Sequence, residues 1–147
     1  MTKLYMKLIL HILLIFTLES CSNESEKPNA DLLGCWKLVG VDGKNESTNM
    51  QFVQYEDKKA KVYWVSETEY GLIVNPYEST YTIEMVDGKR EITFYGDNDT
   101  VTSIIEVKGD QLSLQVKGKS LWTYKRITQK ELDDILKRAV DPAKIGR

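Results

Sequence analysis

The chain has 147 residues, a formal net charge of -2 and 29% charged residues, which is the composition of one ordinary soluble domain. The charges of both signs are mixed along the chain, and no block of basic residues is present. Because phosphate backbones are bound by clustered lysines and arginines, this composition argues against nucleic acid as a partner.

The N-terminal segment has the pattern of an export signal. Lys3 and Lys7 precede an apolar run from Leu8 to Leu18, which only His11 interrupts. Such a run is too short to span a bilayer and matches the apolar core of a secretory signal. The following "LESC" ends at Cys21 and resembles the lipobox of bacterial lipoproteins, although Glu19 departs from the small or apolar residue that is usual there.

This resemblance implies that residues 1–20 are a signal peptide and that Cys21 carries a lipid anchor to a membrane. A plain secreted protein with an incidental cysteine is the alternative. Residues 21–30 are polar and acidic and are expected to form a flexible tether. Acidic residues after the cysteine resemble surface-export signals of some Gram-negative lipoproteins. The expected location is the outer membrane of the cell envelope, with surface display as an option.

Residues 31–127 have the pattern of short antiparallel strands. Asp-Gly pairs in two copies of "VDGK", at 41–44 and 86–89, are strong hairpin signals. Between such turns apolar residues alternate with polar ones, as expected for strands with one buried face. Eight strands are predicted, at about 35–41, 49–56, 60–66, 79–86, 90–95, 101–107, 111–116 and 120–127.

Eight short strands joined mostly by tight turns predict an up-and-down barrel, which leaves no open sheet edge. An open sandwich is the structural alternative. The longest interruption, residues 66–79, contains Gly71 and Pro76. It is expected to be a long loop, or a loop that holds a short extra strand.

The end of the chain, residues 128–147, is predicted to form an amphipathic helix followed by a tail. Thr128 and Glu131 have the spacing of a capping box. Four apolar residues then recur at the spacing of one helix face, namely Leu132, Ile135, Leu136 and Ala139. This face is expected to pack against the wall of strands.

Both ends of the strand region carry a family resemblance. Gly34 and Trp36 in "GCW" resemble the G-x-W signature of lipocalins and the wider calycin group. "LWTYKRI", at 121–127, resembles their last strand, in which a basic residue faces that tryptophan, and the counterpart here is Arg126. With the lipobox, the chain resembles small lipocalin-like lipoproteins of gut-type Gram-negative bacteria. The resemblance implies an all-β fold, an eight-stranded antiparallel up-and-down lipocalin-like barrel with a C-terminal α-helix.

The pair of Trp36 and Arg126 also has a physical interpretation of its own. An indole offers a large apolar face and one N–H donor, and a guanidinium can stack on it while donating to nearby carbonyls. Trp36 is therefore predicted to plug one end of the barrel beneath Arg126 rather than to contact a ligand.

The sequence argues against catalysis. Removal of the signal peptide would take away His11, the single histidine of the chain, and with it any Ser-His or Cys-His catalysis and any histidine-bound metal. If Cys21 is lipidated, Cys35 has no disulfide partner, and it is predicted to be a quiet, partly buried thiol. Paired carboxylates near the long loop, such as Glu67 and Glu69, are the remaining option. We expect no enzyme activity, no cofactor and no metal site.

Two functions are compatible with these features. In the first, the barrel binds a small hydrophobic or amphipathic molecule. The candidate contacts are the aromatic residues expected to point inward, namely Trp64, Tyr81, Phe94, Trp122 and Tyr124. Since a barrel of eight strands is just wide enough to be filled by its own side chains, a solid core is slightly favoured over a cavity.

In the second, the domain is a non-enzymatic envelope or surface interaction protein with a filled core. The candidate contact residues are Tyr70, Asn75 and Tyr77 in the long loop, because exposed aromatic residues are enriched at interfaces. The sequence does not identify a protein partner.

Overall fold

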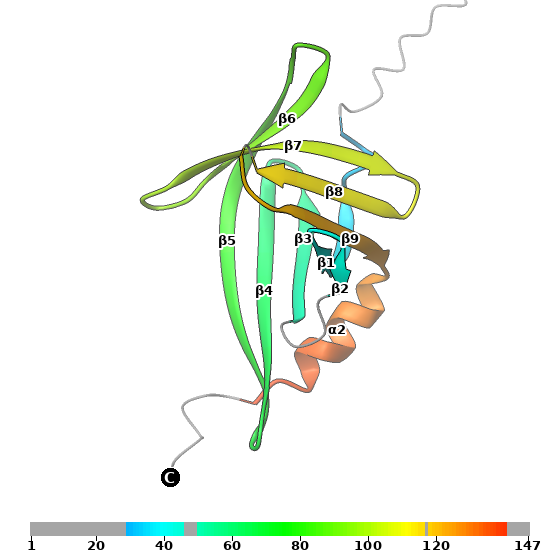
Figure 1. Ribbon diagram of the computed structural model, residues 1–147. Coiled ribbons are helices and arrows are strands. Elements are labelled where there is room, and N and C mark those ends of the chain that lie inside the picture. Colours follow the sequence, from blue (N-terminus) through cyan, green and yellow to red (C-terminus); the bar gives the residue numbers. More distant parts are fainter. Residues whose placement is uncertain (1–28, 46–49, 117, 141–147) are drawn as a thin grey trace, which may run out of the picture. The chain divides into compact units, whose positions relative to one another are not determined.

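A computed structural model describes residues 29–45, 50–116 and 118–140 (Figure 1). The predicted signal peptide at 1–20 and the predicted lipidation site, Cys21, lie outside the described residues. The chain divides into two compact units, Met1–Ala30 and Asp31–Arg147. Every element described below belongs to the second unit.

The described residues form one antiparallel sheet of nine strands. The order in the sheet is β2-β1-β3-β4-β5-β6-β7-β8-β9, and β1 also pairs with β9, so that the sheet closes into a ring (Figure 1). The bounds are β1 (Gly34–Val41), β2 (Lys44–Asn45), β3 (Met50–Glu56), β4 (Lys59–Thr68), β5 (Gly71–Val86), β6 (Lys89–Tyr95), β7 (Thr100–Lys108), β8 (Gln111–Val116) and β9 (Leu121–Ile127).

The prediction of eight strands is wrong by one, because β2 was not expected. Asp42 and Gly43 both have positive φ, at 50° and 74°, which is the backbone of a tight hairpin turn. The chain then pairs two residues of β2 with Gly40 and Val41 before it leaves the sheet. Two residues are too few to produce an alternating pattern, so the sequence carries no signal for this strand.

The prediction of a long loop at 66–79 is also wrong. β4 and β5 pair continuously from Lys59 opposite Thr80 to Thr68 opposite Gly71, so that the segment is one long hairpin. Gly71 has a φ of 119°, which a glycine adopts without strain and which allows a turn of two residues. Gly71 and Pro76 suggested a loop, but Gly71 directly follows the hairpin turn as the first residue of β5, and Pro76 lies within β5.

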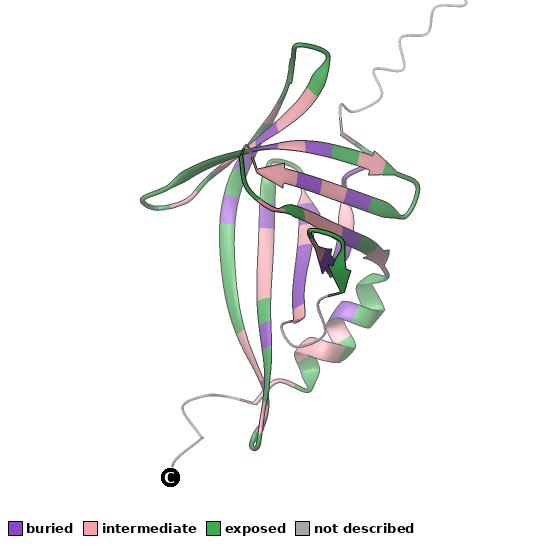
Figure 2. Cartoon of the chain, in the orientation of Figure 1, coloured by how far each residue is buried: buried purple, intermediate pink, exposed green. Residues whose placement is uncertain are grey.

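Buried positions alternate with more exposed ones along the strands (Figure 2). Two hydrophobic clusters lie on the two faces of the sheet. The inner cluster lies inside the ring and includes Trp36 and Leu112. The outer cluster includes Cys35 and Phe52 and packs with the C-terminal helix. Adjacent residues such as Cys35 and Trp36 are thus both buried, because they point to opposite faces and each face is covered.

Helix α2 spans Gln129–Lys137 and begins at the predicted capping box. The Thr128 side chain accepts from the Glu131 backbone N–H, and the Glu131 carboxylate accepts from the Thr128 N–H at 2.7 Å. Leu132 is fully buried in the outer cluster. Ala139, which was predicted on the helix face, lies beyond the helix end and forms a parallel bridge with Leu72. Among the described residues, no helix has the length and apolar character needed to cross a membrane.

Candidate ligand-binding cavity

Trp36 and Arg126 lie in contact inside the ring, on the paired strands β1 and β9. The Arg126 Cζ atom is 4.0 Å from the centre of the Trp36 ring, which is the geometry of a cation–π contact. The Trp36 indole donates to the carbonyl of Leu32 at 2.8 Å, and Arg126 donates to the carbonyl of Leu33 at 2.8 Å. The pair therefore fastens the segment that precedes β1.

Gly34 is required for this arrangement for two separate reasons. Its φ is 112°, a conformation that residues with a side chain rarely adopt. A Cβ atom at this position would also lie 3.2 Å from the Arg126 guanidinium. The glycine of the G-x-W pattern thus allows Arg126 to approach the backbone beside Trp36.

An ion pair completes the contacts of this segment. The Arg90 guanidinium donates to both carboxylate oxygens of Asp31, at 2.7 and 2.8 Å. This hydrogen bonding to Arg90 holds the pKa of the Asp31 carboxyl below its ordinary value. We call this region the closure, and it comprises Asp31, Gly34, Trp36, Arg90 and Arg126. Its aromatic and charged side chains bond to one another and to nearby backbone carbonyls.

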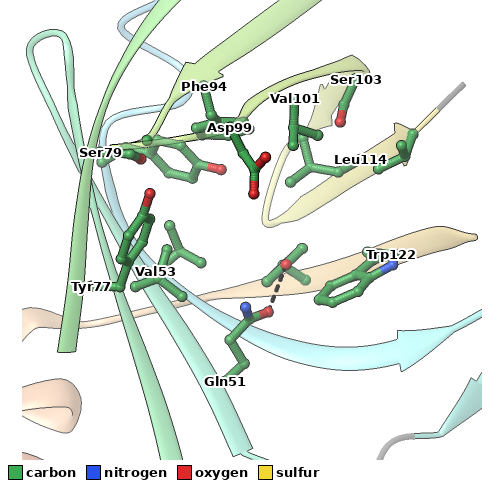
Figure 3. A pocket seen from close by; sticks show the side chains of 15 residues that line it. Gln51, Val53, Tyr77, Ser79, Phe94, Asp99, Val101, Ser103, Leu114 and Trp122 are labelled. Carbon is green, nitrogen blue, oxygen red and sulfur yellow. Dashed lines mark hydrogen bonds between the residues drawn. The ribbon is translucent and has the colours of Figure 1, made fainter. Parts of the chain in front are cut away.

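A cavity of about 380 Å³ lies elsewhere in the ring (Figure 3). This volume falls in the range of roughly 300–1,000 Å³ that is typical of small-molecule sites. The sequence slightly favoured a solid core, whereas this cavity leaves part of the ring unfilled. Several of the lining residues have small side chains, such as Ser79, Ser103 and Val53.

The wall of the cavity is mainly apolar. Five aromatic residues from four strands contribute to it, namely Tyr55, Tyr77, Phe94, Trp122 and Tyr124, and five aliphatic residues complete it, namely Val53, Val62, Val101, Leu114 and Val116. Trp122 packs edge-on against Trp64, with ring centres 6.2 Å apart. Aromatic and aliphatic walls of this kind suit an apolar or amphipathic molecule.

Three buried polar side chains face this cavity. Gln51, Ser79 and Ser103 are the buried polar residues of the described chain, and all three line it. Ser79 lies opposite Ala60, and Ser103 lies between Ile92 and Val116, so their cross-strand neighbours offer no polar side chain. Amide and hydroxyl groups on the wall of a cavity can hydrogen-bond to a ligand or to water.

Two buried tyrosines add neutral hydroxyl groups. Tyr124 donates to the side-chain oxygen of Gln51 at 2.8 Å (dashed line in Figure 3), which leaves the amide nitrogen of Gln51 as a donor. Burial raises the pKa of Tyr55 and of Tyr124 well above the ordinary tyrosine value. Both phenols therefore stay protonated, and the deep part of the cavity is polar but uncharged.

The mouth of the cavity lies between β5 and the β6–β7 turn. Tyr77 and Val101 line the cavity yet are 47% and 43% exposed, so they mark its rim. A Cβ atom on Gly96 would clash with the Tyr77 hydroxyl, so the glycine lets this ring pack against the turn. Asp99, in the same turn, also lines the cavity and is exposed.

The structure places the five residues predicted to contact a ligand in three different environments. Phe94, Trp122 and Tyr124 line the cavity. Tyr81 is a core residue, because its ring packs on Tyr55 and its hydroxyl donates to the carbonyl of Glu56 at 2.8 Å. Trp64 is 39% exposed and does not line the cavity, although its ring packs edge-on against Trp122.

Sequence reasoning missed the polar part of the site. Gln51, Val53 and Tyr55 recur at alternate positions of β3 and all line the cavity. Their period of two could have placed them on one face together. Phe52, between them, is equally buried beneath the helix, so the pattern did not reveal which face pointed inward.

The three candidate partner residues do not share a loop. Tyr70 lies in the β4–β5 turn and is 61% exposed. Asn75 and Tyr77 lie within β5, opposite Trp64 and Val62. The Tyr77 ring also lines the mouth of the cavity.

The structure offers little support for redox or metal chemistry at Cys35. Its thiol is 4% exposed, donates to the Gln129 side chain at 3.1 Å, and has a pKa raised by burial. Within the described ranges, no three His, Cys, Asp or Glu side chains are placed to share a metal ion.

Comparison with known proteins adds no identification. No protein-family model matches the chain, and no curated protein matches it.

Proposed function

We propose that this protein is a lipid-anchored, lipocalin-like binding protein of the cell envelope, whose barrel holds a small hydrophobic or amphipathic molecule. The cavity of about 380 Å³ is the observation that carries the proposal. Its apolar wall with a few converging polar groups is the usual composition of a small-molecule site.

The proposed role is binding and not catalysis. The deep wall of the cavity supplies neutral hydroxyl and amide groups, which orient a ligand by hydrogen bonding. General acid–base catalysis needs a group that titrates near the working pH, and burial moves the pKa values of Tyr55 and Tyr124 away from it.

The family assignment rests on the closure together with the sequence. A glycine that makes room for Arg126, and an indole stacked beneath that guanidinium, support the resemblance to lipocalins that the motifs suggest. The proposed anchor rests on the sequence alone, on the signal-like segment and the lipobox at Cys21.

Binding is tested with N-phenylnaphthylamine, an uncharged aromatic probe that fluoresces in apolar surroundings. We expect a saturable fluorescence rise with the purified protein. Val101→Trp should abolish most of this rise, because Val101 lies at the rim and an indole there would cover the mouth. Thr100→Trp is the matched control, since its side chain lies on the opposite face of β7.

Both variants should retain the melting temperature of the parent protein to within a few degrees, because Val101 and Thr100 are exposed. A probe signal that Val101→Trp and Thr100→Trp leave equally strong would contradict binding in this cavity.

The proposed anchor is tested separately, by labelling with radioactive palmitate in a Gram-negative host. Cys21→Ala should lose the label, whereas Cys35→Ala should keep it, because the Cys35 thiol is buried in the folded domain. Label that survives in Cys21→Ala would refute acylation at this residue.

A further inference from the structure

The charges on the cavity wall differ sharply between its depth and its mouth. Among the described residues that line the cavity, none is Lys, Arg or His, and Asp99 carries the single carboxylate. The depth is formed by neutral groups, including Gln51, Ser103 and the protonated phenol of Tyr55. The wall therefore has no cation to offer a buried anion.

The carboxylate of Asp99 is available to a ligand. Figure 3 shows it directed toward the space enclosed by the labelled side chains. Within the described part of the chain, Asp99 takes part in none of the six ion pairs. Its backbone carbonyl accepts from the Gly96 N–H at 2.9 Å, which holds the turn that carries it.

These charges restrict the ligand. A carboxylate drawn into this neutral cavity would lose its hydration without gaining a cationic partner, and at the mouth it would meet Asp99. A cationic group at the mouth would instead keep part of its hydration and face an opposite charge. The apolar portion of the ligand can enter the cavity with either end group. The charge of the end group therefore decides which of the two ligands binds more tightly.

We propose, on the premise that the cavity binds a ligand at all, that it selects amphipathic molecules with a cationic end group, such as an amine, and rejects fatty-acid-like carboxylates. The apolar body of the ligand lies among Phe94, Leu114 and Trp122, and the amine lies beside Asp99. Gln51 and Ser103 bond to a polar group within the body where one is present.

The test compares three probes with the same ten-carbon chain, decylamine, decanol and decanoate, each below its micelle-forming concentration at neutral pH. Their affinities follow from displacement of N-phenylnaphthylamine and from calorimetry. Decylamine should bind most tightly. Decanoate should bind roughly ten-fold or more weakly than decanol, because its carboxylate is desolvated without a cationic partner.

The variant pair Asp99→Asn and Asp97→Asn isolates the contribution of the mouth. Both residues lie in the β6–β7 turn and are exposed, but Asp97 does not line the cavity. Asp99→Asn should weaken decylamine by about two- to five-fold, as for a solvent-exposed ion pair, and leave decanol unchanged. Asp97→Asn should leave both affinities unchanged. Added salt should reduce the preference for decylamine in the parent protein and not in Asp99→Asn.

The outcomes separate the two proposals. Decanoate that binds as tightly as decylamine, or a decylamine preference that Asp99→Asn leaves intact, overturns the cationic selectivity while the binding function stands. Failure of all three probes and of N-phenylnaphthylamine overturns the binding function itself.

Discussion

The closure around Trp36 and the cavity beside Trp122 both combine aromatic and polar side chains, but the polar side chains have different roles in the two regions. At the closure, the polar atoms of Trp36 and Arg126 bond to backbone carbonyls of the same chain. In the cavity, Ser79 and Ser103 stand opposite apolar neighbours. Polar groups that the fold itself satisfies stabilise the fold, whereas polar groups that it leaves facing a space are free to select what enters.

The largest expected effect is at the closure. Trp36→Ala should lower the free energy of unfolding by about 3–5 kcal/mol, since it removes a fully buried indole and leaves a void. Urea denaturation measures the loss. Trp64→Ala, at a position 39% exposed, serves as a control and should cost less than half as much. Equal losses at the two positions would remove the distinction between the closure and the rest of the ring.

Arg126→Gln should cost about 2–3 kcal/mol, because charged hydrogen bonds and the stacking on Trp36 are both lost. Arg126→Lys should recover less than half of this, since an ammonium group lacks the planar fork. The exposed neighbour Lys125 provides the matched control, and Lys125→Gln should be close to neutral. If Arg126→Lys had the same free energy of unfolding as the parent protein, the positive charge alone would account for the contribution of Arg126.

Asp31→Asn should cost at most about 1 kcal/mol at neutral pH, because its ion pair with Arg90 is partly exposed. The pKa of Asp31 is lowered in the folded protein, so its contribution is present above the ordinary value of 3.8 and is lost as the pH falls below it. Denaturation curves of the parent and Asp31→Asn should therefore converge as the pH falls from about 5 toward 2. If the difference in stability between the parent protein and Asp31→Asn persisted at acidic pH, it would not come from the ionised Asp31 carboxylate.

The smallest expected effect is in the cavity. Ser103→Ala should change the free energy of unfolding by less than about 0.5 kcal/mol, because its cross-strand neighbours offer the hydroxyl no polar side chain. Ser113→Ala, on the neighbouring strand β8, is the control. A loss at Ser103 as large as that of Arg126→Gln would mean that the cavity hydroxyls stabilise the fold, and the comparison with the closure would fail.

The closure could be predicted because its signals are local and distinctive. A glycine two residues before a tryptophan, and a basic residue near the end of the last strand, are visible in the sequence. Strand positions were recovered in the same way, because Asp-Gly turns and alternation are properties of neighbouring residues. The helix start was readable for the same reason, through Thr128 and Glu131.

The cavity could be predicted only in part. Phe94, Trp122 and Tyr124 were found because they are large and lie on inward positions, but Gln51, Ser79 and Ser103 were not. Polar residues are ordinarily assigned to the solvent face of a strand, and both faces of β3 are buried once the helix covers one of them.

By itself the sequence determined the all-β character, the positions of most turns and the capped C-terminal helix, since each depends on residue types at short spacing. The contact of Trp36 with Arg126, which lie far apart in the sequence, was expected from the resemblance to lipocalins. Only the tertiary structure decided that residues 66–79 form a hairpin, that Tyr77 lies at a cavity mouth, and that the interior is hollow beside Ser103. Whether a ring of strands is filled depends on the summed volume of side chains from all its strands, and no local pattern contains that sum.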